Sequence, residues 1–119
     1  MADLEVPDDG ATWLNVLGVA PQVEEVSGDP SVMEARIPLP DAEELHLTWD
    51  VAHGSVRVRY RQADRTVVDL YRERATLLSI HKTDASTALV AEYRAGDCIG
   101  RIRMQTAPHI LVTDEFLQA

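Results

Sequence analysis

The stretch from residue 44 to residue 61 reads ELHLTWDVAHGSVRVRYR, and it alternates apolar and polar side chains on both sides of a central His53-Gly54 pair. Such alternation is typical of half-buried strands, and a glycine-containing pair between two of them is typical of a hairpin turn. A two-residue turn predicts the cross-strand pairs Val51–Val56, Trp49–Val58, Leu47–Tyr60, Asp50–Arg57 and Thr48–Arg59. The stretch therefore predicts an antiparallel hairpin with one apolar face.

The same kind of pattern continues toward the C-terminus. A loop at residues 63–65 leads to a third strand at residues 66–72, and residues 77–82 and 87–94 form a second hairpin around the turn formers at 83–86. A Gly-Asp turn then leads to a strand that ends near Gln105. The predicted pairs are Tyr60–Val68, Val58–Leu70, Arg59–Asp69, Glu92–Arg101, Ala91–Ile102 and Leu89–Met104. Residues 109–112 suit a further strand, and residues 113–115 suit the start of a helical turn.

The N-terminal third is less regular. Apolar residues recur at helical spacing between Asp9 and Gly18, which are a start and a stop signal for a short helix. Residues 22–27 and 32–37 flank Gly28-Asp29-Pro30 and suit a hairpin. Two prolines, Pro38 and Pro40, should keep the following backbone extended as a connection within one domain.

These elements predict an α+β fold. It is a predominantly antiparallel sheet of about six to eight strands, arranged as a meander of hairpins with a short N-terminal helix. The sheet is expected to be curved or half-barrel, and a partly closed barrel is the chief alternative. We interpret residues 1–119 as one globular β-rich domain, with an acidic N-terminal segment (1–43), the meander (44–105) and a C-terminal segment (106–119).

Composition restricts the class of protein. The chain has 119 residues, one cysteine and a formal net charge of −9. A single cysteine cannot form an internal disulfide or a multi-cysteine metal site. The N-terminus lacks a secretory signal, and no uncharged run reaches the length of a membrane span, so a soluble cytoplasmic protein is expected. The negative charge argues against binding to nucleic acid. Ten arginines against one lysine suggest a GC-rich bacterial genome.

The charge is unevenly distributed. Residues 1–50 hold 12 acidic residues and one arginine, for a net charge of −11, whereas residues 51–119 hold 8 acidic and 10 basic residues, for a net charge of +2. Either the acidic segment lies against the arginine-rich half, or it faces a basic partner. The sequence leaves both explanations open.

The sequence contains no familiar catalytic or cofactor motif. The four histidines lack the spacing of a metal site, and Cys98 is best explained as a small apolar residue. Glycine-rich phosphate loops and the Gly-x-Ser-x-Gly elbow are missing. We therefore predict no metal, no cofactor and no catalytic residue, and we favour a protein that is not an enzyme.

One constellation follows from the predicted pairing of the first three strands. Polar side chains gather on one face of the sheet, and arginine is suited to bind carboxylate or phosphate. The candidate binding residues are His46, Thr48, Asp50, Arg57, Arg59, Arg61, Asp69 and Tyr71. Three interpretations remain open: a solvent-facing surface whose arginines are neutralised by Asp50 and Asp69, a docking site for an acidic protein segment, and a site for a small anion.

Three functions are consistent with these observations. The leading hypothesis is a small acidic interaction protein of the adaptor, inhibitor or immunity type, which binds a protein partner of basic character. The alternative is a small-ligand-binding protein or enzyme that uses the polar face of a curved sheet. The third is a subunit that pairs with a second copy through a sheet edge.

Overall fold

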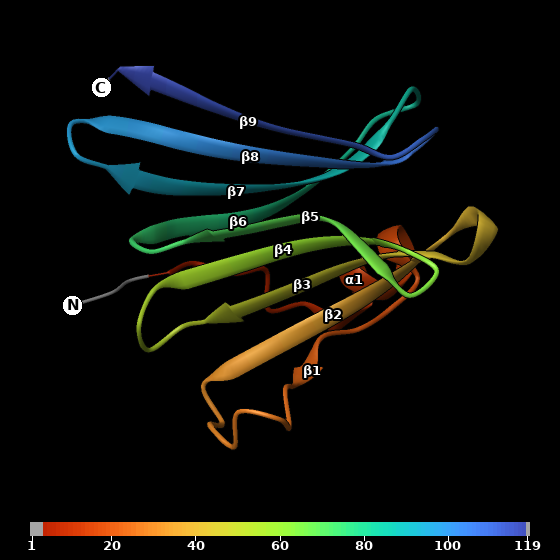
Figure 1. The fold of residues 1–119 in the computed structure, drawn as a ribbon, viewed down its shortest axis with the longest axis horizontal. Helices are drawn as coiled ribbons and strands as arrows, with labels where there is room; N and C mark the ends of the chain where they lie inside the picture. Colours follow the sequence, from red (N-terminus) through yellow and green to blue (C-terminus); the bar gives the residue numbers. More distant parts are fainter. Residues whose placement is uncertain (1–3, 119) are drawn as a thin grey trace.

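The computed structural model describes residues 4–118 as two stacked antiparallel sheets and one short helix (Figure 1). The first sheet has the order β1-β2-β3-β4-β5 and the second has the order β6-β7-β8-β9. The elements are α1 (Gly10–Leu17), β1 (Gln22–Val23), β2 (Val32–Leu39), the 3-10 turn η1 (Pro40–Ala42), β3 (Glu43–Asp50), β4 (Ser55–Gln62), β5 (Arg65–Arg72), β6 (Ala75–Lys82), β7 (Thr87–Ala95), β8 (Cys98–Ala107) and β9 (Leu111–Gln118).

This architecture confirms the predicted fold class: a mostly antiparallel sheet protein with one N-terminal helix. Within residues 4–118 the strands number nine rather than six to eight, and they include the two-residue β1 and the C-terminal β9. The sheets do not close into a barrel, so two layers, and not the barrel alternative, describe the fold.

The first hairpin differs from its predicted register by two residues. The observed pairs are Trp49–Val56, Leu47–Val58, Leu45–Tyr60, Thr48–Arg57 and Asp50–Ser55. Asp50 explains the longer turn, because its carboxylate accepts hydrogen bonds from the backbone N–H groups two and three residues ahead, at 2.9 and 3.1 Å. These side-chain hydrogen bonds stabilise a turn and compete with the backbone hydrogen bonds of strand pairing. Since the shift is even, each side chain keeps its predicted face.

The other predicted registers are confirmed. β4 and β5 pair as Tyr60–Val68, Val58–Leu70 and Arg59–Asp69, and β7 and β8 pair as Glu92–Arg101, Ala91–Ile102 and Leu89–Met104. The predicted C-terminal helical turn is wrong, because residues 113–115 lie inside β9 and pair with β8. The edge of β8 offers backbone hydrogen-bond partners to all of β9, and these bonds outweigh the local preference of residues 113–115 for a helix start.

The predicted hairpin around Gly28-Asp29-Pro30 is shorter than expected. Only Gln22–Val23 pairs with β2, and residues 24–31 form a loop. Glu24 holds the start of this loop, since its carboxylate accepts hydrogen bonds from the backbone N–H groups of Val26 (2.6 Å) and Ser27 (3.1 Å). The side chain thereby replaces the ladder bonds that a longer strand would have made.

The helix forms as predicted. Asp9 caps the N-terminus by accepting a hydrogen bond from the Ala11 backbone N–H at 3.0 Å, and Gly18 ends the helix in the left-handed conformation. Trp13 and Leu17 are the buried residues of the helix, whereas the neighbouring Leu14 is exposed. The helix has eight residues, and no helix within residues 4–118 is long and apolar enough to cross a membrane.

The core lies between the two sheets, and α1 packs against it. Residues of both sheets and of α1 form one buried cluster, which includes Trp13, Leu17, Ile37, Leu45, Leu47, Trp49, Val58, Leu78, Leu89, Tyr93, Ile102 and Met104. Two further features join the layers. Residues 4–17, here called the N-terminal strap, contact both sheets: Glu5 forms a parallel bridge with Leu77 of β6, and Trp13 stacks on Trp49 of β3.

A polar clasp also links the sheets. Arg72 of β5 lies 2.5 Å from one carboxylate oxygen of Asp114 in β9, and the other oxygen accepts a hydrogen bond from the Tyr93 hydroxyl at 2.6 Å. The Arg72 guanidinium also lies over the Tyr93 ring, 5.3 Å from its centre. These three residues come from three different strands, so they fix how β5 sits relative to the second sheet.

Candidate functional site

The predicted polar face is the outer face of the first sheet, turned away from the core. His46, Thr48 and Asp50 lie on β3, Arg57, Arg59 and Arg61 on β4, and Asp69 and Tyr71 on β5. Five of the eight line one groove of about 620 Å³, here called the polar groove: His46, Thr48, Arg57, Arg59 and Arg61. Asp50, Asp69 and Tyr71 do not line it.

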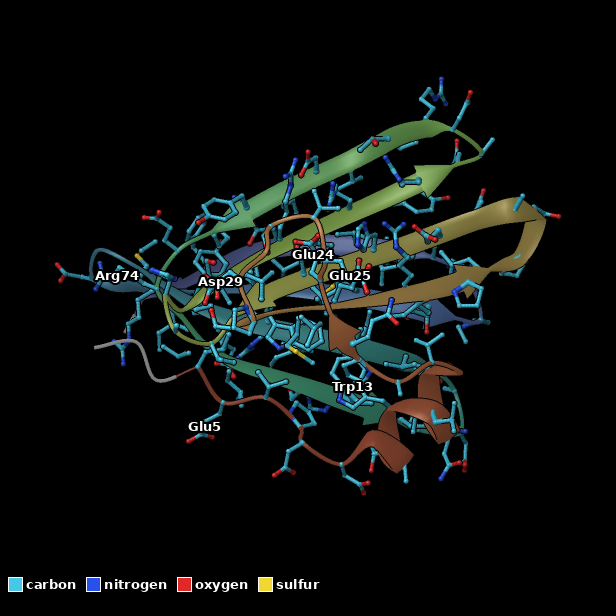
Figure 2. The ribbon with its side chains drawn as sticks, turned by 90° about the horizontal axis from the view of Figure 1, so that it is seen from below. Glu5, Trp13, Glu24, Glu25, Asp29 and Arg74 are labelled. Atoms are coloured by element: carbon cyan, nitrogen blue, oxygen red, sulfur yellow. The ribbon has the colours of Figure 1, made fainter. Side chains whose placement is uncertain are left out.

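The groove also has walls that the sequence analysis did not assign to the site. Glu34 and Arg36 project into it from β2, and the loop after β1 contributes residues 24–27. Figure 2 shows this loop, with Glu24 and Glu25 labelled, lying across the strands of the first sheet. At its tip Val26 is 97% exposed, so an apolar side chain stands free beside the polar groove.

His46 is the most deeply buried polar residue of the groove, with an exposed fraction of 3%. Its Nε2 lies 2.7 Å from Glu34 Oε1, and the same oxygen lies 3.4 Å from Arg36 Nε. Burial lowers the pKa of His46, while the hydrogen bond with Glu34 opposes this shift and the charges of Arg36 and Arg59 add to it. The imidazole is therefore neutral at pH 7, with its proton on the Nε2 that faces the carboxylate.

The arginines of the groove differ in their partners. Arg57 forms two hydrogen bonds with Asp69, at 2.9 and 2.7 Å, and Arg36 pairs with Glu44 at 3.1 Å. Within residues 4–118, no carboxylate lies within 4.0 Å of the Arg59 guanidinium. Burial lowers the pKa of Arg59, and the nearby charge of Arg57 adds to this effect. The prediction that Asp69 neutralises an arginine is thus met at Arg57, not at its cross-strand neighbour Arg59.

Asp50, unlike Asp69, does not pair with an arginine, because its carboxylate is bonded within the turn after β3. It accepts hydrogen bonds from Ser31 and from His53 Nδ1, the latter at 2.7 Å, and this bond raises the pKa of His53. Asp29, Asp50 and His53 offer ligand atoms within 4.8 Å of one another, so these are residues that could hold a metal ion. Hydrogen bonds within the turn already account for their arrangement.

Tyr71 lies apart from the groove. It is 53% exposed and lines a small depression of about 170 Å³ with Asp50 and Arg57. The structure therefore does not bring the eight predicted residues into one site: five line the groove, Asp50 belongs to the turn, Asp69 is bonded to Arg57, and Tyr71 lines this shallow depression.

Within residues 4–118, the acidic first half makes no ion pair with an arginine or lysine of the second half, and Asp50 instead pairs with His53 in the turn after β3. Among the described residues, every Arg or Lys beyond position 50 that has a carboxylate within 4.0 Å finds it beyond position 50 as well. The loop carrying Glu24 and Glu25 lies beside the arginines without pairing with them. Internal neutralisation, one of the two explanations for the charge asymmetry, thus lacks the contacts it requires.

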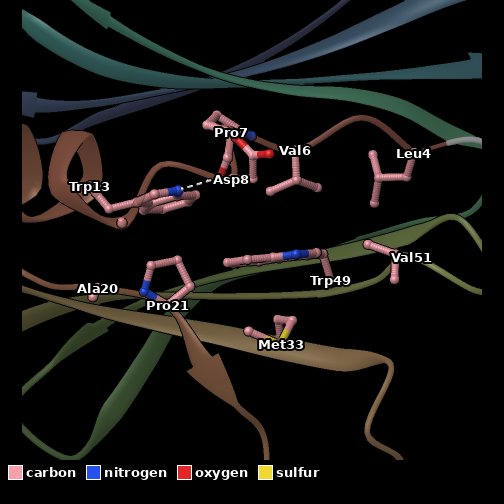
Figure 3. Close-up of a pocket in the computed structure, with 11 residues that line it drawn as sticks. Leu4, Val6, Pro7, Asp8, Trp13, Ala20, Pro21, Met33, Trp49 and Val51 are labelled. Carbon is pink, nitrogen blue, oxygen red and sulfur yellow. Dashed lines mark hydrogen bonds between the residues drawn. The ribbon is translucent and has the colours of Figure 1, made fainter.

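A second cavity, of about 460 Å³, lies between the N-terminal strap and β3 (Figure 3). Trp13 and Trp49 stack there with ring centres 5.3 Å apart, and Trp13 Nε1 donates a hydrogen bond to the Pro7 carbonyl at 2.8 Å. Its walls are mostly apolar, and none of the eight predicted binding residues lines it. The polar groove and this apolar cavity are thus separate places.

His46 should make the stability of the protein depend on pH. Its pKa in the folded chain lies below the ordinary value of 6.5, so the unfolded chain binds a proton that the folded chain does not. Stability is therefore lost as the pH falls below 6.5 and through the folded pKa. We expect the loss of melting temperature between about pH 7.5 and 5.5 to be smaller in His46→Gln than in the natural chain. An equal loss in both would contradict this assignment. His53, whose pKa is shifted the opposite way, is present in both proteins.

Comparisons with known proteins give one strong similarity, which is in structure. No family model matches the sequence, and no curated protein does. A chain in the solved structure of a contact-dependent growth inhibition toxin–immunity protein complex from Klebsiella pneumoniae 342 has the same fold, with a TM-score of 0.79. The match covers 98% of this chain and 100% of that chain, at 14% sequence identity. At this identity the likeness establishes the fold.

Proposed function

We propose that this chain is an immunity-type protein, which binds a toxic protein partner and neutralises it without being an enzyme itself. The observation that supports the proposal most directly is the likeness in fold, over nearly the whole length of both chains, to a chain of a toxin–immunity protein complex. Of the two roles in such a complex, the neutralising one suits this chain better, because the sequence carries no familiar catalytic motif.

The charge of the chain supports a partner of basic character. Exposed acidic residues of the first half, such as Glu5, Asp8, Glu25 and Asp41, have no arginine partner within the described residues. Their field attracts a positively charged protein over distances comparable with the Debye length. The net charge of −9 therefore raises the rate at which this chain meets a basic partner.

Association with the partner should accordingly depend on salt. We expect the association rate constant to fall by about tenfold between roughly 20 and 300 mM NaCl, with a much smaller change in the dissociation rate. Stopped-flow or surface-binding kinetics measure both rates. An association rate that does not respond to salt would indicate that apolar contacts, not long-range charge, bring the two proteins together.

Native mass spectrometry of the protein purified gently from its own host tests the proposal. A complex with one copy of a second protein is expected, and expression of that partner alone should arrest growth unless this chain is also expressed. The matched control is an unrelated toxin, against which this chain should give no protection. A chain that binds no protein, or whose partner is harmless, would overturn the immunity role.

A small-ligand-binding function is the second candidate, and the polar groove is the observation that favours it. The groove contains two buried polar atoms without a partner, His46 Nδ1 and Arg59 Nε. A small bound mass in the same spectra would support this function.

A homodimer through a sheet edge remains a prediction as well. β9 is an edge strand that carries the exposed side chains of Leu111, Phe116 and Leu117. A mass of twice the chain would support it.

A further inference from the structure

Two buried polar atoms at the floor of the polar groove lack hydrogen-bond partners: His46 Nδ1 and Arg59 Nε. The two residues lie directly opposite each other in the pairing of β3 with β4, so their side chains emerge side by side on the outer face. His46 is 97% buried, since its exposed fraction is 3%. Buried polar atoms are nearly always paired in native proteins, so this unpaired couple indicates a group supplied from outside.

The charge of the groove indicates that this group is an anion. The charges of Arg57, Arg61 and Arg36 act on Arg59 and are opposed by that of Asp69, but no carboxylate of the described chain lies within 4.0 Å of the Arg59 guanidinium. Among the side chains of residues 4–118, Arg61 donates only to the Thr66 hydroxyl, at 3.3 Å. Glu24, Glu25 and Glu34 also line the groove, so it is better suited to one added negative charge than to two. A carboxylate meets these conditions, and its planar oxygens match the donors of arginine.

We propose that the polar groove receives the carboxylate of an acidic side chain of the protein partner, which accepts hydrogen bonds from Arg59 Nε and from a protonated Nδ1 of His46. The proposal rests on the proposed function and adds the contact through which the partner is recognised. The groove, of about 620 Å³, is large enough for a side chain with the backbone that carries it, and the exposed Val26 stands at its rim as an apolar contact for the same segment. A basic partner still presents some acidic side chains.

Binding of a carboxylate requires a change in the protonation of His46. In the free chain Nε2 of His46 donates to Glu34, and Nδ1 is a bare acceptor that would repel a carboxylate. The imidazole must therefore take up one proton from solvent when the carboxylate enters, and the resulting cation lies between two anions. The charged groups that share the groove with His46 are Glu34 and Arg36 from β2, Arg57, Arg59 and Arg61 from β4, and Glu24 and Glu25 from the loop after β1. Of all these groups, histidine alone ordinarily titrates between pH 5 and 8.

A peptide titration followed by nitrogen-15 NMR of the His46 ring tests the contact without the partner. The probe is acetyl-Gly-Glu-Gly-amide, and its glutamine counterpart is the matched control. We expect the glutamate peptide alone to move the Nδ1 resonance toward its protonated position, with an affinity that rises about tenfold between roughly pH 7.5 and 5.5. Arg59→Gln should weaken binding at least tenfold, whereas Arg94→Gln, an exposed arginine of the second sheet, should not.

Several outcomes would overturn the proposal. No response at His46, or an equal response to the glutamine peptide, would show that the groove does not select a carboxylate. Free glutarate that binds far more tightly than the peptide would identify a small-ligand site instead of a partner contact. Arg59→Gln relieves repulsion among arginines and should fold, which a thermal melt checks.

The partner itself supplies a separate readout. Arg59→Gln should weaken the complex by at least tenfold, and more strongly at pH 6 than at pH 8. A complex that forms with unchanged affinity in this variant would overturn the contact and leave the proposed function standing. Conversely, if the peptide binds as expected and no partner complex exists, the proposed function fails while the carboxylate site remains.

Discussion

Replacing Trp13 with alanine should lower the free energy of unfolding by about 3–5 kcal/mol, as expected when a fully buried tryptophan is truncated. Trp13 is 0% exposed, stacks on Trp49 with an interplanar angle of 11°, and donates a hydrogen bond to Pro7. The stacking adds about 0.5–1.5 kcal/mol to the effect of buried area. Domains of this size are stable by only about 5–15 kcal/mol, so the variant should unfold at a much lower denaturant concentration.

Leu14→Ala is the matched control, because Leu14 is the next residue of α1 and is 55% exposed. Truncation of the Leu14 side chain should change the free energy of unfolding by no more than about 0.5 kcal/mol. Trp13→Phe should fall between the two, since it keeps a ring on Trp49 and loses the hydrogen bond to Pro7. Equal effects of Trp13→Ala and Leu14→Ala in a urea titration would mean that the helix is not anchored in the core through Trp13.

Gly100→Ala should also be strongly destabilising, by about 1–3 kcal/mol or more, because the added methyl group has no space. A Cβ at this position would lie 2.1 Å from Cζ of Tyr93, its cross-strand partner on β7. The ring cannot easily move away, since its hydroxyl is bonded to Asp114 and its edge faces Phe116, with ring centres 6.0 Å apart. Glycine is thus required here by the tyrosine above it and not by its own backbone angles.

A double-mutant cycle separates this clash from a general weakening of β8. In a Tyr93→Ala background the added methyl group meets no ring, so Gly100→Ala should then cost much less, with a coupling of at least about 1 kcal/mol. Gly10→Ala, where an added Cβ has nothing within 4 Å, serves as the control. Additive effects of the two substitutions would contradict the proposed clash.

Most of the fold could be predicted because the pairing is local. Each strand from β2 onward within its sheet pairs with its neighbour in sequence, so alternation and turn residues were enough to place the registers of β4 with β5 and of β7 with β8. The register of the first hairpin was predicted wrongly for a chemical reason. Its turn is set by the hydrogen bonds of the Asp50 side chain, and alternation alone cannot distinguish registers that differ by two.

The polar groove could be predicted only in part. The strand pattern placed the arginines of β4 on one face with His46, but Glu34 and Arg36 join them only because β2 lies beside β3. The alternation of Met33, Glu34 and Ala35 indicates that Glu34 lies on the outer face once β2 is known to pair with β3. The loop of residues 24–31 follows no strand or helix periodicity, so its position over the sheet was beyond sequence reasoning.

The N-terminal strap gives the molecule an unusual order of assembly during synthesis. Hairpins between neighbouring strands can form as the chain leaves the ribosome, because each strand meets its partner soon after it is made. The strap is made before the residues that hold it, because Trp49 in β3 and Leu77 in β6 are translated later. The strap is therefore fixed only after later segments of the chain have been made. A nascent chain that stalls before Leu77 leaves Leu4 and Val6 without the second sheet, and these apolar side chains stay available to chaperones.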